Sequence, residues 1–335
     1  MGLKTKMNKI TGLIKAKIFF PAIFNVLSLK ARKRQMSILQ ASCARGALTQ
    51  YLESLLIAKL RRKFKKQIKI NAQMIKENEA SLEHGKPKRI WVCWLQGMEN
   101  APAIVRICYQ SLLDTFGNEY EIKVITEENY ENYVQFPDFI IRKYKKGFIS
   151  RTHFSDLLRL ELLIGYGGIW LDSTLFFTGK LPDFMLDSNL FVFQSIWPQL
   201  FGRATRTESW FISACQNESM LIFVRNMLYA YWDKFNVLID YWLVYDMFEF
   251  AIEQFPDIWK EVIPVSQCDI HILQDKFLDE FNQDVFDETV NRVHIHKLNW
   301  RYNEQELSKP NTYYQYLISH YKQFSIGSEE NERFD

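Results

Sequence analysis

The pattern of apolar and polar positions divides the chain into a long helical segment followed by alternating strands and helices. Leucines recur at helical spacing between residues 46 and 80 and predict a helix there. Short apolar runs then predict strands at 89–94, 121–125, 168–172, 191–194 and 210–214. Amphipathic runs between them predict helices at 102–116, 137–146, 151–165, 217–233 and 238–255. Fully apolar strands that alternate with helices are typical of an open, mostly parallel α/β sheet.

A polar patch that contains proline, residues 84–88, marks the expected start of the globular body. The first strand, helix and second strand then span about 35 residues, the length of a β–α–β crossover. We therefore expect a basic, partly amphipathic helical extension at 1–85, a Rossmann-type α/β domain at 86–305, and a helical or polar tail at 306–335.

Composition excludes several classes of protein. With 335 residues, of which 47% are hydrophobic, the chain has enough apolar material for a large core, so a disordered chain is excluded. Glycine (13) and proline (9) are too sparse for a many-turned all-β fold. The five cysteines are scattered without a C-x-x-C pair, which favours reduced thiols over disulfides or a zinc site.

Charge is distributed unevenly along the chain. Residues 1–88 contain 20 Lys and Arg against 4 Asp and Glu, whereas the other 247 residues contain 22 against 35. Polybasic amphipathic segments bind anionic membrane surfaces. A solvated helical arm packed on the body is the alternative interpretation. Nucleic acid is not expected as a partner, because few aromatic residues lie between the basic ones.

The apolar run from Ile18 to Leu29 is too short for a membrane-spanning helix and is interrupted by Pro21 and Asn25. No small-residue cleavage site follows it, and Lys6 breaks the myristoylation pattern that would begin at Gly2. We therefore expect a cytoplasmic protein that is peripherally attached to the inner face of the membrane.

Candidate chemistry is concentrated between residues 155 and 174. Asp156 and Arg159 are three residues apart, so they share one face of the predicted helix. Gly167 and Gly168 permit a tight turn from this helix into the next strand. Taken alone, the Asp156–Arg159 pair also fits an ordinary surface ion pair.

The strand that follows ends in Asp172, at the edge of the sheet where α/β proteins bind ligands. A carboxylate beside the hydroxyls of Ser173 and Thr174 is a hard-oxygen site suited to Mg²⁺ or Mn²⁺ and a substrate phosphate. The alternative is an aspartate that makes only turn hydrogen bonds.

The ordered combination of these motifs resembles glycosyltransferase family 32, the family with the DXD sugar-binding region, and especially its capsular polysaccharide synthesis branch. The resemblance begins at Arg89-Ile-Trp-Val-Cys-Trp-Leu-Gln-Gly97 and continues through Ser155-Asp-Leu-Leu-Arg159 and Gly167-Gly-Ile-Trp-Leu-Asp172. It extends more weakly to His296-Lys-Leu298 and covers roughly residues 88–300, without the basic extension.

This resemblance implies a GT-A-like fold and a transferase of the hexosyltransferase type. The enzyme would transfer a sugar, with retention, from a nucleoside diphosphate sugar such as a UDP-sugar to a polysaccharide or lipid-linked glycan. It also implies a divalent cation, Mn²⁺ or Mg²⁺. A catalytically silent scaffold of the same fold, binding glycans or nucleotide sugars, is the alternative.

Carried over by position, Asp156 would contact hydroxyls of the donor, Arg159 would lie beside its sugar or diphosphate, and Asp172 would be the first acid of the DXD element. Asp172 and Arg159 are thus the candidate catalytic residues. The expected donor-binding residues are Trp91, Asp156, Arg159, Gly167, Gly168, Asp172, Thr174 and Lys297.

Thr174 departs from the family pattern, because it stands where the second aspartate of DXD is usual. One carboxylate neutralises less of the charge of a divalent cation than two, so the departure weakens the expectation that a metal ion binds here. His296 is expected to ligate the metal beside Asp172, with Lys297 on the leaving phosphate, and His294 competes for the ligand role. A strand with alternating surface histidines would give the same H-x-H-K pattern.

Glu208, Asp240 and Asp246 are candidates for acceptor contact or for a catalytic base, although each also fits an ordinary polar or capping role. Aromatic residues crowd the segment from 191 to 250. They fit sugar stacking, and they also fit simple core packing.

Overall fold

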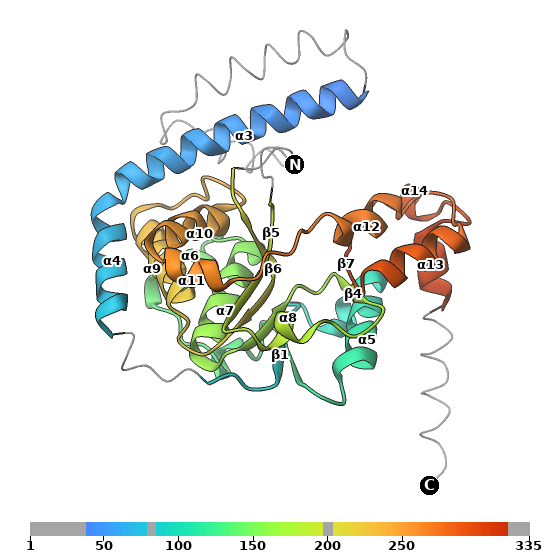
Figure 1. The fold of residues 1–335 in the computed structure, drawn as a ribbon, viewed down its shortest axis with the longest axis horizontal. Coiled ribbons are helices and arrows are strands. Elements are labelled where there is room, and N and C mark those ends of the chain that lie inside the picture. Colours follow the sequence, from blue (N-terminus) through green and yellow to red (C-terminus); the bar gives the residue numbers. More distant parts are fainter. Residues whose placement is uncertain (1–37, 79–84, 197–203, 321–335) are drawn as a thin grey trace.

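The computed structural model describes residues 38–78, 85–196 and 204–320, and a five-stranded sheet forms its centre (Figure 1). The strand order is β2-β1-β3-β6-β5. These strands are β1 Arg89–Cys93, β2 Glu121–Ile125, β3 Gly168–Leu171, β5 Leu190–Gln194 and β6 Thr207–Ala214. All five were predicted from their apolar runs.

Strand direction confirms the expected mostly parallel sheet. β1 pairs in parallel with both β2 and β3, whereas β6 is antiparallel to its neighbours β3 and β5. Four of the five strands therefore point the same way. Alternate residues of β1 pack on opposite faces, with Trp91 in one hydrophobic cluster and Val92 in another. Burial on both faces explains why β1, β3 and β5 are almost continuously apolar.

Helices cover both faces of the sheet (Figure 1). The helices α7, α9 and α10 lie on one face, and α5 and α8 lie on the other. The predicted helices correspond to α5 Ala103–Phe116, α6 Asp138–Lys145, α7 Arg151–Tyr166, α9 Ser219–Lys234 and α10 Leu243–Gln254. Short helices complete the body: α8 Asp183–Asp187, α11 Pro256–Glu261, α12 Ile272–Lys276, α13 Gln283–Arg292 and α14 Glu304–Leu307. The predicted α/β class is confirmed.

The predicted helix at 46–80 is instead two helices, α3 Ile38–Lys63 and α4 Lys65–Asn78, which meet at Phe64. Phe64 is fully buried and packs against Tyr231 and Phe235. The chain bends at this anchor, so α3 crosses one end of the body while α4 runs along its side (Figure 1). The two helices therefore contribute to the main core, as the packed-arm interpretation expected.

A second, two-stranded sheet joins distant parts of the chain. It pairs β4 Leu175–Phe177 with β7 Ile295–Lys297 in antiparallel register, with Leu175 opposite Lys297. Neither β4 nor the pairing was predicted, because three-residue strands are too short to show a period of two. This pairing brings residue 297 to the end of β3.

The apolar run from Ile18 to Leu29 lies outside the described residues. Within the described ranges, none of the helices combines the length and apolarity needed to cross a bilayer.

Candidate functional site

A cleft of about 560 Å³ opens at the carboxyl ends of β1 and β3. Its floor comes from the residues that follow these strands, and its walls come from the first turns of α7, the turn before α10 and the segment after β7. Ligands of open α/β sheets bind at this edge. The predicted position of the site at the end of residues 168–172 therefore coincides with a real cleft.

Asp172 lies on the floor of this cleft, with 28% of its side chain exposed. Its Oδ1 accepts hydrogen bonds from Arg159 (3.2 Å) and from the Trp170 indole (3.1 Å), and its Oδ2 accepts one from Lys297 (3.0 Å). Burial alone would raise the pKa of this carboxyl group, but Lys297 and Arg159 together hold it below its ordinary value. Asp172 is therefore an anion fixed between two cations.

Arg159 reaches Asp172 from the buried face of α7. It is 5% exposed, and its Nη1 donates to the backbone oxygen and to the hydroxyl of Ser209, at 2.6 and 2.5 Å. Burial opposes the guanidinium charge, but the carboxylates of Asp156 and Asp172 raise its pKa above the ordinary value. The guanidinium also lies over the Trp170 ring, 5.0 Å from its centroid, so this contact adds to the hydrogen bonds that hold it in place.

Asp156 lies behind Arg159 and does not line the cleft. Its Oδ1 is 3.0 Å from Arg159 Nη2, and its Oδ2 is 3.2 Å from Nδ1 of the buried His153. The surface ion pair considered as an alternative is thus a buried pair in the structure. In this geometry Asp156 acts on a ligand through Arg159, as a positioning residue.

β7 sends its two candidate side chains to opposite faces. Lys297 enters the cleft, where Nζ lies 3.0 Å from Asp172 Oδ2 and 2.7 Å from Thr174 Oγ1. His296 is fully buried on the other face, where Nε2 lies 3.4 Å from Thr178 Oγ1. Burial, assisted by His294, lowers the pKa of His296 to about 4. The structure therefore brings Lys297 to Asp172 and keeps His296 away from it, because neighbouring strand residues alternate.

These residues do not fit a divalent cation. Asp172 is the only carboxylate among the described residues that line the cleft, and both of its oxygens are bonded to cations. At an effective dielectric of about 20, unit charges 4 Å apart interact by about 4 kcal/mol, and a doubly charged ion would meet twice that repulsion from each neighbouring cation. In the described part of the chain, no three His, Cys, Asp or Glu side chains come together as a metal group.

Three further residues expected to bind the donor, besides Asp156, do not line the cleft. Trp91 is fully buried, and its indole donates to the backbone oxygen of Gly167 at 3.0 Å. Gly167 and Gly168 form the turn at the start of β3, at the edge opposite Asp172, with φ values of 68° and 103°. Their role in the structure is local, since these backbone conformations favour glycine.

The three acceptor candidates do not line the cleft either. Glu208 is buried in β6 and accepts a hydrogen bond from Ser195, and Asp246 is fully buried in α10. Asp240 accepts a hydrogen bond from the backbone of Trp242 in the turn before α10. This contact matches the capping alternative for Asp240.

Sequence reasoning missed several residues of the cleft wall, notably Arg151, Trp300 and Arg301. Trp300 packs edge-on against Trp94 at 5.5 Å between ring centroids, and the Arg301 guanidinium lies 5.1 Å from the Trp300 ring. The aromatic segment is divided between roles, since Tyr241 and Trp242 line the cleft while Tyr231 and Trp232 are core. The sequence did contain a signal for Trp300 and Arg301, because they follow Lys297, a predicted site residue, by only three and four positions.

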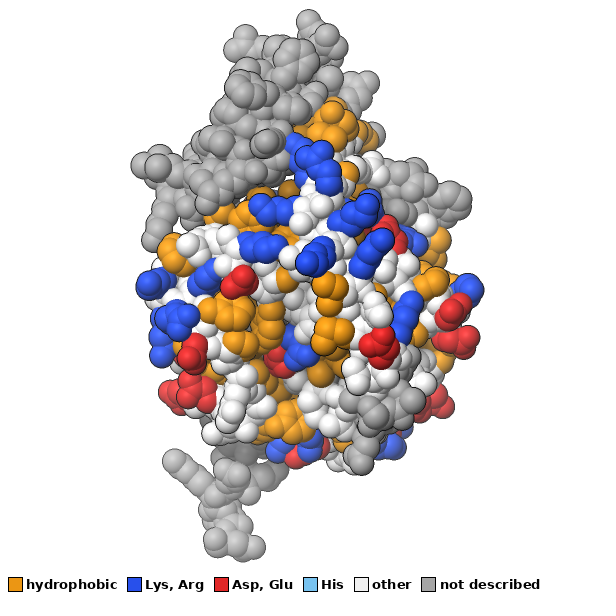
Figure 2. Space-filling view, turned by 90° about the vertical axis from the view of Figure 1, so that its left-hand side faces the viewer, with side chains coloured by type: hydrophobic (Ala, Val, Ile, Leu, Met, Phe, Trp, Pro, Cys, Tyr) orange, Lys and Arg blue, Asp and Glu red, His pale blue; other side chains and the backbone are white. Residues whose placement is uncertain are grey.

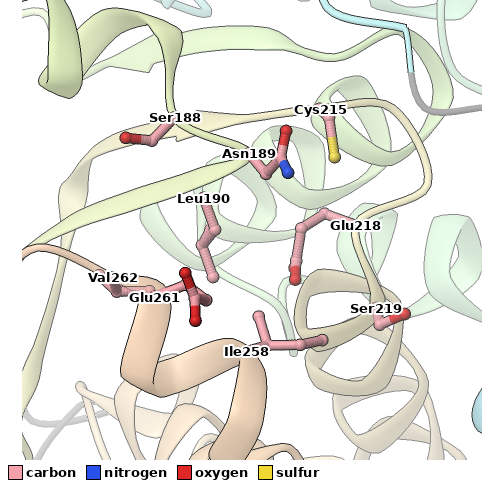
Figure 3. A pocket seen from close by; sticks show the side chains of 9 residues that line it. All are labelled: Ser188, Asn189, Leu190, Cys215, Glu218, Ser219, Ile258, Glu261 and Val262. Carbon is pink, nitrogen blue, oxygen red and sulfur yellow. The ribbon is translucent and has the colours of Figure 1, made fainter.

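A second pocket, of about 480 Å³, lies at the opposite edge of the sheet (Figure 3). Glu218 and Glu261 extend into it, with Leu190 and Ile258 between them. Burial raises the pKa of its thiol, Cys215, to about 11. It contains none of the predicted site residues, so the cleft at Asp172 remains the candidate site.

Comparisons with known proteins relate the chain to glycosyltransferases. An O-glycosyltransferase of Phomopsis amygdali, PaGT, is 31% identical over 101 residues, which cover 27% of this chain and 25% of that protein. The chain thus spans about a quarter of the length of this curated relative. A solved structure, the PaToxG glycosyltransferase, covers 78% of this chain and 96% of its own at 14% identity, with a TM-score of 0.36. That score adds nothing to the fold assignment, which rests on the sheet described above.

The profile of one family matches most of the chain, from residue 43 to residue 317. The match includes α4 and most of α3 together with the body. Membership of glycosyltransferase family 32 stays a prediction, and so does the assignment of Asp172 as the first acid of a DXD element. The branch predicted from the motifs is confirmed: the chain belongs to the capsular polysaccharide synthesis protein family.

Proposed function

We propose that this protein is a glycosyltransferase that transfers a sugar from a nucleoside diphosphate sugar, most simply a UDP-sugar, to a glycan acceptor in cell-surface polysaccharide synthesis. The observation that carries the proposal is the cleft at the ends of β1 and β3. Four cationic side chains and one carboxylate line it: Arg151, Arg159, Lys297, Arg301 and Asp172. A cleft with this excess of positive charge suits a diphosphate.

The proposed reaction breaks the bond between the anomeric carbon and the oxygen of the terminal donor phosphate, and the electron pair stays on that oxygen. The acceptor hydroxyl oxygen forms the new bond, and its proton passes to the departing phosphate. Charge therefore develops on the diphosphate, where Lys297 and Arg159 stand as fixed donors of hydrogen bonds. Preorganised cations in a partly buried site stabilise such charge well, because they need no reorganisation during the reaction.

Within the same proposal, the sugar and the acceptor lie along the aromatic wall. Trp300 is 37% exposed and Tyr241 is 54% exposed, and both line the cleft. Exposed aromatic rings next to a polar floor suit the apolar faces of sugar rings. A polysaccharide or lipid-linked glycan is the acceptor class that the family name supports.

Retention at the anomeric carbon is also proposed, by attack from the face of the leaving group. The support is that Asp172, the only carboxylate lining the described cleft, is held by two cations, so it is poorly suited both to attack the sugar and to serve as the base that an inverting transfer needs. NMR of the product's anomeric proton tests this, because an inverted product contradicts it.

Nucleotide-sugar binding and turnover test the proposed function. A thermal-shift screen of nucleotide sugars should identify a donor, since a ligand that binds only the native state raises the melting temperature. Asp172→Asn removes the charge that orients Lys297 and Arg159, so donor turnover should fall by about 100-fold or more. Lys309→Asn, at an exposed position outside the cleft, is the matched control.

The outcomes separate the two candidate functions. A donor that is transferred or hydrolysed by the native protein and hardly at all by Asp172→Asn supports the enzyme. Tight binding without any turnover would support the scaffold alternative. A screen in which no nucleotide sugar binds would refute both.

A further inference from the structure

Under the DXD assignment predicted for Asp172, the Lys297 ammonium lies between the two side chains that would ligate the motif's metal ion. Nζ lies between residue 172 and residue 174, 3.0 Å from the Asp172 carboxylate and 2.7 Å from the Thr174 hydroxyl. Residue 174 is the position where the motif usually has its second acid. A cation that is part of the chain thus bonds both side chains that would be metal ligands.

The surrounding backbone fixes this arrangement. Lys297 is paired with Leu175 across the two-stranded sheet. The next residue, Leu298, donates its backbone N–H to the backbone oxygen of Thr174 at 2.9 Å. Only 16% of the Lys297 side chain is exposed. The lysine therefore extends from a hydrogen-bonded strand of the two-stranded sheet toward Asp172, at the end of β3 in the central sheet.

We propose that the Lys297 ammonium is the resident cation of this site, so that the nucleoside diphosphate binds without a divalent metal ion. The inference rests on the proposed function and names the group that receives the diphosphate. Lys297 lines the cleft, and Arg159, Arg151 and Arg301 supply further positive charge there.

The remaining ligands support the same conclusion. The Thr174 hydroxyl is neutral and already accepts from Lys297, so it supplies no charge to a metal. His271, the histidine that lines the cleft, has its ring nitrogens 3.0 Å from Gln274 Oε1 and 3.1 Å from Gln267 Oε1. A divalent ion bound through a single carboxylate would compete with Arg159 and Lys297 for Asp172 and would be repelled by both.

Calorimetric binding of free nucleotides to the full chain tests the inference. UDP, GDP, ADP and CDP are titrated in EDTA and again in excess MnCl₂. We expect at least one nucleotide to bind in EDTA with an affinity within about threefold of that in Mn²⁺, because the lysine replaces the metal charge. Binding that appears only with Mn²⁺, or weakens by about tenfold or more in EDTA, overturns the inference and leaves the proposed function intact. No binding in either buffer refutes both.

Variants assign the effect to the lysine. Lys297→Met keeps the length of the side chain and removes its charge, so nucleotide binding in EDTA should weaken by about 10-fold or more. Lys297→Arg should restore most of the affinity. Lys309→Met, which removes an exposed lysine outside the cleft, should bind as the native chain does. Unchanged binding by Lys297→Met, with a native melting temperature, would contradict the inference.

A designed metal site provides a readout that is independent of activity. The double variant Lys297→Met with Thr174→Asp has two carboxylates and no ammonium, so it should bind Mn²⁺. Titration followed by the EPR signal of free Mn²⁺ should show a site about tenfold or more tighter than in the native chain. A native chain that binds Mn²⁺ as tightly as the double variant would contradict the inference, even if the variant is less stable.

Discussion

At the residue scale, the site is a chain of hydrogen-bonded polar side chains that runs from the core to the cleft. His153, Asp156, Arg159, Asp172 and Lys297 follow one another, each within 3.2 Å of the next. Buried charges are stable only when they are paired and hydrogen-bonded. The i, i+3 spacing of Asp156 and Arg159 was visible in the sequence, but their shared partner Asp172 was not, because that contact is made across the fold.

His296 makes the stability of the protein depend on pH. Its pKa is lowered by burial from 6.5 to about 4, so between these values the unfolded chain binds more protons than the folded chain. The stabilisation is complete above the unfolded pKa and is lost as pH falls toward the folded one. Between pH 7.5 and pH 5 this residue should remove about 2 kcal/mol of stability.

Melting temperatures at pH 7.5 and pH 5 check this prediction. His296→Gln has no group that titrates in this range, so its melting temperature should fall less on acidification than that of the native protein. The melting temperature of Lys309→Gln, a variant at an exposed position outside this segment, should fall as that of the native protein does. Equal falls for all three proteins would show that His296 does not titrate in this way.

At the element scale, the turn between α7 and β3 depends on glycine. A Cβ on Gly167 would lie 2.7 Å from the Gly85 backbone oxygen and 2.8 Å from the Gln216 backbone nitrogen, and its φ is positive. Gly167→Ala should therefore lower the free energy of unfolding by about 2 kcal/mol or more. Urea denaturation, monitored by circular dichroism, measures this free energy of unfolding.

Gly165 is the matched control, two residues earlier in α7. A Cβ there meets nothing within 4 Å, so Gly165→Ala should leave stability unchanged or raise it by up to about 1 kcal/mol. If the two alanine variants unfold at the same urea concentration, the turn does not need glycine at residue 167.

Elements with a strong local pattern were predictable, and short or bent ones were not. The strand at 168–171 is apolar on both faces, and α7 begins at a Ser150 cap that accepts from the His153 backbone at 3.2 Å. By contrast, β7 has three residues, too few to define a period. The break between α3 and α4 at Phe64 was also missed. Phe64 continues the helical pattern of the sequence, and its burial depends on a contact with Tyr231 that is made across the fold.

At the scale of the whole molecule, we propose that the outer face of α4 attaches the protein to an anionic membrane surface. Ile68 and Ile75 pack inward, while Lys66, Lys69 and the 54% exposed Met74 face solvent. Figure 2 views this side of the molecule and shows Lys and Arg side chains gathered around apolar ones. Basic residues around exposed apolar groups favour an anionic interface.

Charge reversal tests the membrane proposal better than truncation. Each basic residue near the surface contributes about 1 kcal/mol, so Lys66→Glu with Lys69→Glu should weaken binding to phosphatidylserine vesicles by about 10-fold or more. Vesicle co-sedimentation measures this, with Lys309→Glu as the control. Sedimentation that does not change in the double variant would refute the role of α4.

Deleting α3 and α4 would not distinguish a loss of membrane attachment from a loss of folding. Leu60, Phe64 and Ile68 are buried in the main core, so their removal would expose the surface of α9 that they cover. The domain boundary expected near residue 85, between the extension and the α/β domain, stays a prediction. In the structure, the helices on its N-terminal side share the core of the body.

The sequence by itself determined the class of fold, the order of the long elements and the place of Asp172 at the end of a buried strand. These features depend on local periodicity, which a single chain displays directly. Only the tertiary structure decided which side chains meet Asp172. Lys297 lies 125 residues away along the chain and reaches it because β7 pairs with β4 in one register. A shift of that register by one residue would have presented His296 to the cleft and buried the lysine, because successive strand residues face opposite sides.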